Sequence, residues 1–557
     1  MLLGWLVLLA GVVALNASAG GTFRDEFELP GSETQAAIDF LNEKDFSTRA
    51  GFSGQIVFQA AGGGVDTPVV RAAMEKLFAD IERSVDEASI ESPFSPEGRR
   101  QIAADETIAY AEVNFGERDS NGYQDASEQI KALVADVDVE GLRIELGGDV
   151  FLEEPEFSSE GIGFIAAMII LLIAFGSLLA MGLPLLTAIF GVGSGVALVG
   201  LVVNFIDMPS FSTQAVMMIG IGVGIDYALF IVTRYREGLH EGLQPEDAVV
   251  RALDTAGRAV LFAGSTVVIA VLGLFVIGLS FVRGLAIGIS IGVLMTMLAS
   301  VTLLPAILGF AGRNIDRLGL PHRRQTKSDD EQRFWFRWSR VIQRRPWPAL
   351  VLASLFLAVL ALPVFAMRLG FGDAGNRPVS DTTRGAYDLL SQGFGAGFNG
   401  PLLLAIELPQ GIDGDAATLG RLTQELNRTR GVAFATGAIP NAAGDAAIMQ
   451  VFPATSPQDE ATERLVRDLR GEIVPRITEG TGVSVLVGGV TAAVLDFSSF
   501  TGERLPLFIA AVLILSFLLL MVVFRSVLVP LKAVLVNLLS ISAAYGVLVA
   551  VFQWGWG

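Results

Sequence analysis

Nine apolar stretches dominate this chain and restrict the folds open to it. A helix needs about 17–25 predominantly apolar residues to cross the hydrocarbon core of a bilayer. Hydrophobic residues make up 52% of the chain and charged residues 17%, below the roughly 25% charged residues of soluble domains. The sequence therefore predicts a polytopic α-helical membrane protein. The expected spans are residues 1–17, which is short, 161–181, 184–204, 213–233, 259–279, 284–310, 348–366, 505–524 and 529–552.

Two long polar segments interrupt the apolar stretches, at residues 18–158 and 367–502. Each combines the hydrophobic spacing of amphipathic helices with short strand-like runs. We therefore expect two compact α/β domains outside the membrane. The clearest helices are residues 67–85 and 416–429, and the clearest strands are 54–59 and 482–487.

Basic residues in the short loops predict which side faces the cytoplasm, because Lys and Arg accumulate there. Four arginines lie between residues 234 and 258, and ten bases lie between 311 and 347. This distribution predicts a multi-pass protein of the inner (plasma) membrane with both polar segments extracytoplasmic. The expected order is a first span at 1–17, a first extracytoplasmic α/β domain at 18–158, spans two to six at 159–310, a cytoplasmic basic and aromatic linker at 311–347, span seven at 348–366, a second extracytoplasmic α/β domain at 367–502, and spans eight and nine at 503–557.

The first apolar stretch has two interpretations. Ala17-Ser18-Ala19 fits a signal-peptidase site after a short apolar run. No basic region precedes that run, so we favour an uncleaved first span that is clipped at its start.

An acidic residue lies inside one expected span. Residues 217–232 are apolar except for Asp226 and its neighbour Tyr227. A carboxylate near the bilayer centre costs at least roughly 2.5–3.5 kcal/mol, so such residues usually face a bundle interior and mark ion or proton pathways. The alternative is an Asp that only bonds neighbouring helices. Adjacent helical residues point about 100° apart, so Asp226 and Tyr227 should address different neighbours.

Small and polar residues accompany this acid. Gly220, Gly222 and Gly224 could clear space for close helix approach, and ordinary packing explains them equally well. Ser265 and Thr266, in the following span, could support a relay through a hydroxyl or water-mediated bond to Asp226. Both residue types are common in spans, so packing is the alternative for them too.

The 311–347 linker interleaves aromatic and basic residues in Phe334-Trp335-Phe336-Arg337-Trp338-Ser339-Arg340. Nucleic-acid binding is one interpretation, but a net charge of −19 argues against a nucleic-acid partner. Trp and Arg are typical anchors at the membrane interface, so an interfacial helix is favoured. The chain has no cysteine, which excludes disulfides and thiolate chemistry. Its two histidines fall in separate loops, which argues against a histidine-rich metal site.

The chain also repeats itself. Parallel repeats of a span, an outer domain and a span bundle are typical of transporters. The repeated pieces are Phe175-Gly176-Ser177-Leu178-Leu179 with Phe524-Arg525-Ser526-Val527-Leu528, the trio Pro30, Ser32 and Thr34 with Pro378, Ser380 and Thr382, and Gly147-Gly148 with Gly488-Gly489.

In these features the chain resembles, essentially end to end, the MmpL family of the RND superfamily of proton-driven exporters. The order and spacing of several motifs together carry the resemblance. They are Gly222-Val223-Gly224-Ile225-Asp226-Tyr227-Ala228-Leu229-Phe230 with Arg234-Tyr235-Arg236-Glu237, Phe524-Arg525-Ser526 with Pro530-Leu531-Lys532-Ala533, Ala174-Phe175-Gly176-Ser177, Leu304-Pro305-Ala306, and Arg344-Arg345-Pro346-Trp347.

The resemblance implies an RND-type bundle of twelve spans in two halves, each with an α/β porter domain outside. It implies a proton relay through an Asp-Tyr pair in the fourth span of each half, here Asp226 and Tyr227. The implied activity is export of a lipid or another hydrophobic or amphiphilic molecule by antiport, with no cofactor beyond the proton gradient. The second pair should lie in a tenth span, so we expect a sequence truncated before that span.

Three alternative classes of protein would require other features in the sequence. A translocation accessory of the same superfamily should have one outer domain, whereas this chain repeats its outer domain. That the chain is a non-autonomous fragment of a transporter is a further alternative, which the sequence leaves open. A sterol-sensing receptor should carry extracellular cysteines. An intramembrane enzyme needs a second acid within reach of Asp226, and no other expected span has one near its centre. We therefore expect a non-enzyme, whose substrate and whose state as a monomer or homo-oligomer the residues leave open.

Overall fold

The computed structural model describes residues 1–24, 28–46, 53–96, 98–116, 118, 120–152, 159–316, 329–370 and 372–556. The chain divides into two compact units, and each unit combines separated parts of the sequence. The first unit contains Met1–Glu28, Glu156–Arg368 and Thr501–Gly557, and the second contains Leu29–Pro155 and Leu369–Phe500. The chain therefore passes between the units several times.

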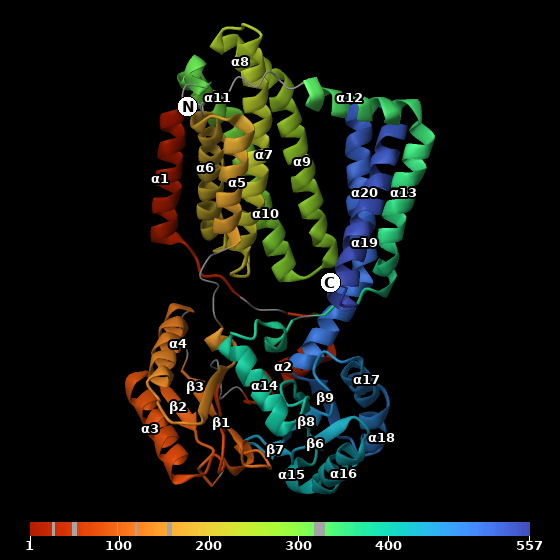
Figure 1. Cartoon of the computed structure of the whole chain (residues 1–557). Coiled ribbons are helices and arrows are strands. Elements are labelled where there is room, and N and C mark those ends of the chain that lie inside the picture. Colours follow the sequence, from red (N-terminus) through yellow and green to blue (C-terminus); the bar gives the residue numbers. More distant parts are fainter. Residues whose placement is uncertain are drawn as a thin grey trace. The chain divides into compact units, whose positions relative to one another are not determined.

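The first unit consists of helices (Figure 1). Eight of the described helices are long and apolar enough to cross a membrane, when continuous runs such as Pro245–Ile277 and Ser280–Ile315 are each taken as one. A ninth apolar helix, Gly161–Phe175, is shorter. The predicted polytopic helical membrane protein is thus confirmed. The helices are α1 (Leu2–Ala19), α5 (Ser159–Phe175), α6 (Leu178–Val202), α7 (Ser212–His240), α8 (Pro245–Ala252), α9 (Arg258–Leu272), α10 (Ser280–Leu298), α11 (Leu304–Ala311), α12 (Asp329–Arg344), α13 (Pro346–Ala361), α19 (Val490–Phe524), which begins in the second unit, and α20 (Leu528–Leu548).

The boundary between α5 and α6 differs from the expected one at residues 181–184. The turn lies at Gly176, whose φ of 64° is left-handed and suits glycine. Ser177 then caps α6 by accepting a hydrogen bond from the Ala180 N–H, as serine commonly does. Pro184 consequently lies inside α6. In the repeated motif, Arg525 takes the place of Gly176, with φ 47°.

The second unit contains two antiparallel sheets covered by helices. One sheet has the strand order β2-β3-β1-β4, and the other has β6-β8-β5-β9 with β7 paired to β8. The predicted strands at 54–59 and 482–487 correspond to β1 and β9, and the predicted helices at 67–85 and 416–429 correspond to α3 and α16. The bounds are β1 (Ser53–Ala60), α3 (Pro68–Ser84), β2 (Ala88–Glu91), β3 (Ile108–Phe115), α4 (Ser120–Ala135), β4 (Leu142–Gly147), β5 (Leu402–Glu407), α15 (Gly411–Gly414), α16 (Ala416–Arg428), β6 (Val432–Ala435), β7 (Ile439–Pro440), β8 (Ala446–Pro453), α17 (Glu460–Asp468), α18 (Val474–Thr478) and β9 (Ser484–Gly488).

The two α/β layers exchange one helix each, so they are not the two separate domains that were expected at 18–158 and 367–502. Helix α2 (Glu33–Glu43), from the first polar segment, packs on β9 and β5 of the second sheet. Helix α14 (Thr382–Phe394), from the second segment, packs on β4 and β1 of the first sheet (Figure 1). Each sheet is therefore covered by a helix from the other polar segment, so the boundaries of the polar segments are not the boundaries of the folded layers.

The repeated glycine pairs make this exchange sterically feasible. A Cβ on Gly147 would lie 3.2 Å from the Ala386 Cβ of α14, and a Cβ on Gly488 would lie 3.1 Å from the Ala37 Cβ of α2. The first glycine of each pair therefore lets the exchanged helix approach the end of a strand. The second glycine turns the chain with positive φ, 100° at Gly148 and 94° at Gly489.

Candidate functional site

Asp226 and Tyr227 lie in α7, which packs closely on α6 and α10. A Cβ on Gly224 would lie 3.2 Å from the Ala188 Cβ of α6 and 3.4 Å from the Thr296 Cγ2 of α10. A Cβ on Gly220 would lie 2.8 Å from the Val192 Cγ2. These two glycines thus permit close helix approach, whereas a Cβ on Gly222 would meet no atom of the described residues within 4 Å.

One face of α7 is uncovered and carries the acid. Met218, Gly222, Asp226 and Phe230, each four residues apart, are all exposed in the first unit, and such spacing places them on one helix face. Within the described residues, Asp226 has no hydrogen-bond or ion-pair partner. Its carboxylate therefore lies on a surface that the other described helices leave open.

Tyr227 points elsewhere, as the 100° separation of adjacent residues predicts. Its ring is 5% exposed and belongs to an apolar cluster that includes Leu171 of α5 and Leu183 of α6. Its hydroxyl is buried and has no hydrogen-bond partner among the residues that the structure describes. A buried hydroxyl without a partner is energetically unfavourable, so this group is available to bond a water or a further polar group.

Ser265 and Thr266 lie in α9 and bond within their own helix. The Ser265 hydroxyl donates to the Leu261 carbonyl at 2.8 Å, and the Thr266 hydroxyl donates to the Phe262 carbonyl at 2.9 Å. No hydrogen bond in the described part of the chain joins either hydroxyl to Asp226. Their supporting role in the relay stays a prediction.

Sequence reasoning missed the role of Tyr235, which lies at the other end of α7. Its ring is fully buried, and its hydroxyl lies 3.3 Å from the Leu308 carbonyl and 3.2 Å from the Gly312 carbonyl, beside α11. Next to it, the Arg236 guanidinium donates to the Phe175 carbonyl at 3.2 Å and lies over the Phe175 ring. The Arg-Tyr-Arg-Glu motif therefore docks α7 onto α5 and α11.

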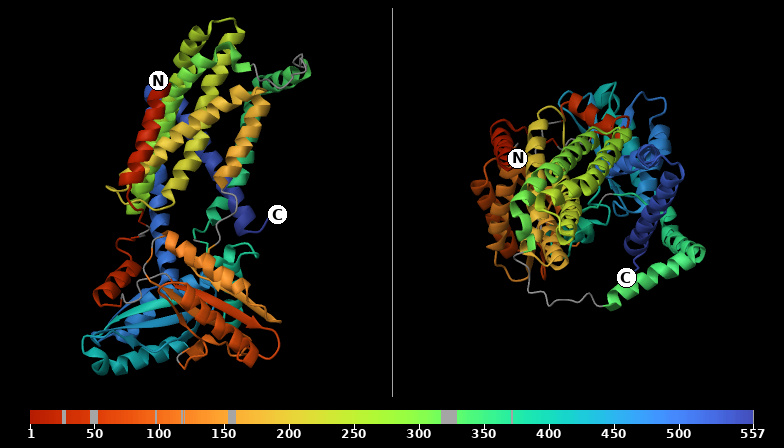
Figure 2. Two further views of the ribbon diagram at one scale, coloured as in Figure 1. Left: turned by 90° about the vertical axis from the view of Figure 1, so that its left-hand side faces the viewer. Right: turned by 90° about the horizontal axis from the view of Figure 1, so that it is seen from above.

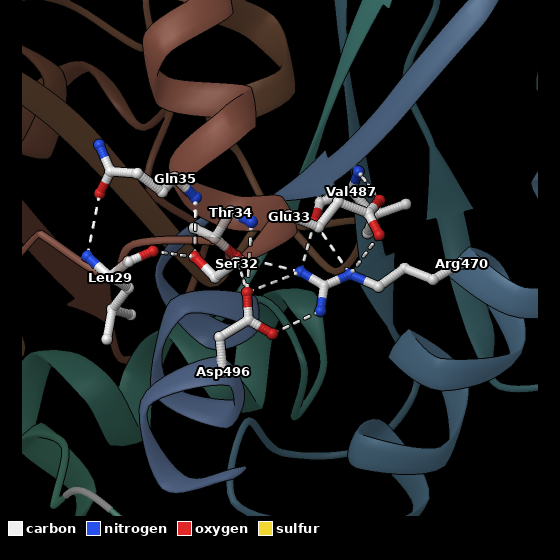
Figure 3. A network of polar contacts seen from close by, with 8 residues as sticks. All are labelled: Leu29, Ser32, Glu33, Thr34, Gln35, Arg470, Val487 and Asp496. Carbon is white, nitrogen blue, oxygen red and sulfur yellow. Dashed lines mark hydrogen bonds and ion pairs between the residues drawn. The ribbon is translucent and has the colours of Figure 1, made fainter. Parts of the chain in front are cut away.

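In the second unit, a polar clamp holds the exchanged helix α2 (Figure 3). Arg470 forms ion pairs with Asp496 of α19 at 2.5 Å and with Glu33 of α2 at 3.3 Å, and it donates to the Val487 carbonyl at 2.7 Å. The Thr34 hydroxyl donates to Asp496 at 2.6 Å. The clamp could not be predicted from the sequence, because Thr34 lies more than four hundred residues from both Arg470 and Asp496.

An N-cap serine positions the two α2 residues of the clamp. Ser32 accepts a hydrogen bond from the Gln35 N–H and starts α2 there, which aligns Glu33 and Thr34 in the first helical turn. Glu33 also accepts a hydrogen bond from the Val487 N–H at 2.7 Å, at the end of β9. On the other layer, the repeated threonine Thr382 donates to Glu145 at 2.8 Å and accepts from the Leu146 N–H. Both exchanged helices thus dock through a threonine in their first turn.

The glycines of α7 predict a matched pair of substitutions. Gly224→Val should hinder the packing of α7 on α6 and α10 at a cost of about 1–3 kcal/mol, since an overpacked interface must shift. Gly222→Val, on the open face, should leave that packing intact. The thermal midpoint of the purified protein in detergent checks both variants. Equal midpoints for Gly222→Val and Gly224→Val would contradict this account of the glycines.

The clamp predicts acid sensitivity of the second unit. Burial alone would raise the pKa of Asp496, but hydrogen bonds from Arg470 and Thr34 hold its pKa below the ordinary carboxyl value. Its stabilising contribution is therefore complete above the unfolded pKa of about 3.9 and is lost as pH falls through the folded pKa. Unfolding followed by circular dichroism should show stability falling below about pH 4. The Asp496→Asn variant should lack this part of the fall, and an unchanged acid profile would refute the prediction.

Comparison with known proteins decides the family. The MMPL family model matches residues 29–349 and 412–556, which include α7 and strands of both sheets of the second unit. The chain belongs to the MMPL family. The recognition of an MmpL transporter of the RND superfamily from its motifs is thereby confirmed.

Three relatives illustrate this membership. Membrane protein YdfJ of Bacillus subtilis is 35% identical over 554 residues, which cover 99% of this chain and 75% of that protein. The mycolic acid-containing lipids exporter MmpL11 of Mycolicibacterium smegmatis is 34% identical over 396 residues, which cover 70% of this chain and 41% of that protein. MmpL11 of Mycobacterium tuberculosis, named a heme uptake protein, is 34% identical over 399 residues, 70% of this chain and 40% of that protein.

Proposed function

We propose that this MMPL protein exports a lipid or another amphiphilic molecule from the cytoplasmic membrane, driven by the proton gradient and without a further cofactor. The observation that carries the proposal is Asp226 in the apolar part of α7, exposed on an open helix face. An ionisable residue in a span indicates an ion or proton pathway. The name of the M. smegmatis relative, a lipid exporter, supports a lipid substrate.

The chemistry of Asp226 suits a relay. A carboxylate binds one proton on an oxygen and can release it again, so Asp226 can take up a proton from the acidic side. Once neutral, it no longer needs a polar partner, and helices can pack against its face. Loss of the proton to the other side restores the charge. The hydroxyl of Tyr227, one residue on, has no hydrogen-bond partner in the described part of the chain and is suited to bond a water that carries the proton.

The proposed orientation places the second unit outside the cytoplasm. Arg234, Arg251, Arg258 and Arg313 are at the ends of spans joined by short loops, and such bases favour the cytoplasmic side. The sheets and the clamp would then face the exterior, where an exported amphiphile must be received. Neither nucleic acid nor an enzymatic reaction is part of this proposal.

A second candidate is uptake of an amphiphilic ring compound. The M. tuberculosis relative named a heme uptake protein favours it, since it is as similar to this chain as the exporter is. Both candidates use the same proton relay and differ in direction.

The test is transport by the intact protein in inverted membrane vesicles with a fluorescent phospholipid or heme as cargo. Export predicts cargo accumulation inside the vesicles that requires an imposed proton gradient and stops on addition of a protonophore. Release of cargo under the same gradient would favour uptake. Movement of cargo that is unaffected by the protonophore would refute proton coupling.

A further inference from the structure

Helix α12 ends where a membrane span begins. Arg345 breaks the helix with φ −134° and ψ 60°, and Pro346 starts α13, in line with the bias of pre-proline residues away from helical conformation. α13 belongs to a candidate span, Pro346–Ala366. The C-terminal end of α12 is therefore held at the level where a span leaves the membrane. Figures 1 and 2 show α12 at the periphery of the first unit, lying across the end of α13.

One side of α12 is apolar and uncovered. Trp338, Val341 and Ile342 are 54%, 56% and 40% exposed, and they lie within about 100° of helical arc. Trp347, in the first turn of α13, is 75% exposed and continues the apolar surface toward the span. Water-exposed apolar side chains on one arc are unfavourable, so this arc fits an apolar surrounding.

A stripe of arginines flanks the apolar arc. Arg337, Arg340 and Arg344 lie within about 60° of arc, and all three side chains are exposed. None of them forms an ion pair with a side chain that the structure describes. Arg340 also lies 4.8 Å from the centre of the Phe336 ring. These three guanidinium groups in one line match a row of phosphates, which arginine binds in a bidentate manner.

We propose that α12 binds anionic phospholipid headgroups at the membrane surface beside α13. The arginine stripe contacts the phosphates, while Trp338, Val341 and Ile342 enter the boundary between headgroups and acyl chains. Charge complementarity and the direct continuation into a span select this partner. An amphipathic helix with bases beside its apolar face typically lies in the interface in this way. The chain's net charge of −19 disfavours a nucleic acid. This inference is independent of which molecule the protein transports.

The absence of cysteine from the chain allows a clean probe. The variant Val341→Cys, in the full chain, carries a single nitroxide label on the apolar arc. The protein is reconstituted in nanodiscs of phosphatidylcholine alone or mixed with phosphatidylglycerol. Electron paramagnetic resonance then measures whether the label is accessible to oxygen in the acyl region or to a water-soluble relaxation agent.

We expect an immersed label in phosphatidylglycerol discs and weaker immersion in phosphatidylcholine discs. Each base near an anionic surface contributes roughly fivefold in binding, so Arg337→Gln, Arg340→Gln and Arg344→Gln together should lower the immersed-to-free ratio on the order of a hundredfold. The matched triple Lys variant keeps the charge but loses the bidentate bonds, so it should retain more immersion than the triple Gln variant and less than the unsubstituted stripe. Exchange of two exposed arginines of the second unit, Arg99→Gln and Arg100→Gln, should change nothing. In the unsubstituted stripe, high salt should release the label, because salt screens surface charges.

Two results would overturn the proposal. Equal immersion in both kinds of nanodisc, unaffected by the triple Gln exchange or by salt, would show a purely apolar anchor. A label that stays in water in every bilayer would show that the arc does not enter the membrane interface.

Discussion

Asp226→Asn is expected to reduce proton-driven transport to the level seen after collapse of the gradient, while the protein still inserts in the membrane. Asn cannot gain or lose a proton, so the relay has no carrier. A neutral amide costs less to insert in a span than a carboxylate, so the variant should be produced at least as well as wild type. Transport in vesicles and the yield of membrane-extracted protein measure the two effects.

Asp207→Asn is the matched control for this exchange. Asp207 lies in the loop between α6 and α7, is exposed, and pairs with Arg24 at 3.1 Å. An exposed ion pair contributes about 0–1 kcal/mol, so this variant should transport normally. Full transport by Asp226→Asn, or equal loss in both variants, would rule out Asp226 as the proton carrier.

Arg470→Met is expected to destabilise the second unit by about 3–5 kcal/mol, because it leaves buried charge without a partner. Asp496 and Glu33 would lose their cation, and the Val487 carbonyl would lose a donor. Detachment of α2 from the second sheet should follow. Limited proteolysis between the first span and β1, together with the thermal midpoint of the intact protein, measures this loss.

Arg476→Met provides the comparison, since Arg476 forms an exposed ion pair with Glu472 at 3.4 Å. Its removal should cost less than about 1 kcal/mol. A double variant that replaces both Arg470 and Asp496 by apolar residues should recover part of the stability, because no unpaired charge remains between them. Similar midpoints for Arg470→Met and Arg476→Met would refute the structural importance of the clamp.

The repeated motifs could be found from the sequence, but their purpose could not. Gly147-Gly148 and Gly488-Gly489 appeared as matching strand ends. Their use became visible only with Ala386 and Ala37 of the exchanged helices packed against them. A pattern of residues along the chain records local geometry, whereas the partner of each glycine comes from the other polar segment.

The candidate site shows the same limit. Asp226 could be identified because a carboxylate in an apolar run is costly wherever the helix packs. The opposite surroundings of Asp226 and Tyr227 followed from helix geometry. The docking role of Tyr235 could not be derived, although it lies in a recognised motif, because its acceptors are carbonyls beside α11. Arg470 and Asp496 belong to no recognisable sequence motif, because their partners Glu33 and Thr34 lie in a distant part of the chain.

The amino-acid sequence alone was enough to predict a helical membrane protein with repeated motifs and an acid inside one span, because bilayer thickness and the cost of a charge in lipid act on each segment separately. The three-dimensional fold was needed to show that α2 and α14 change places, that Gly220 and Gly224 pack while Gly222 does not, and that Arg470 joins α2 to α19. These features depend on contacts between residues far apart in the chain, which local periodicity cannot specify.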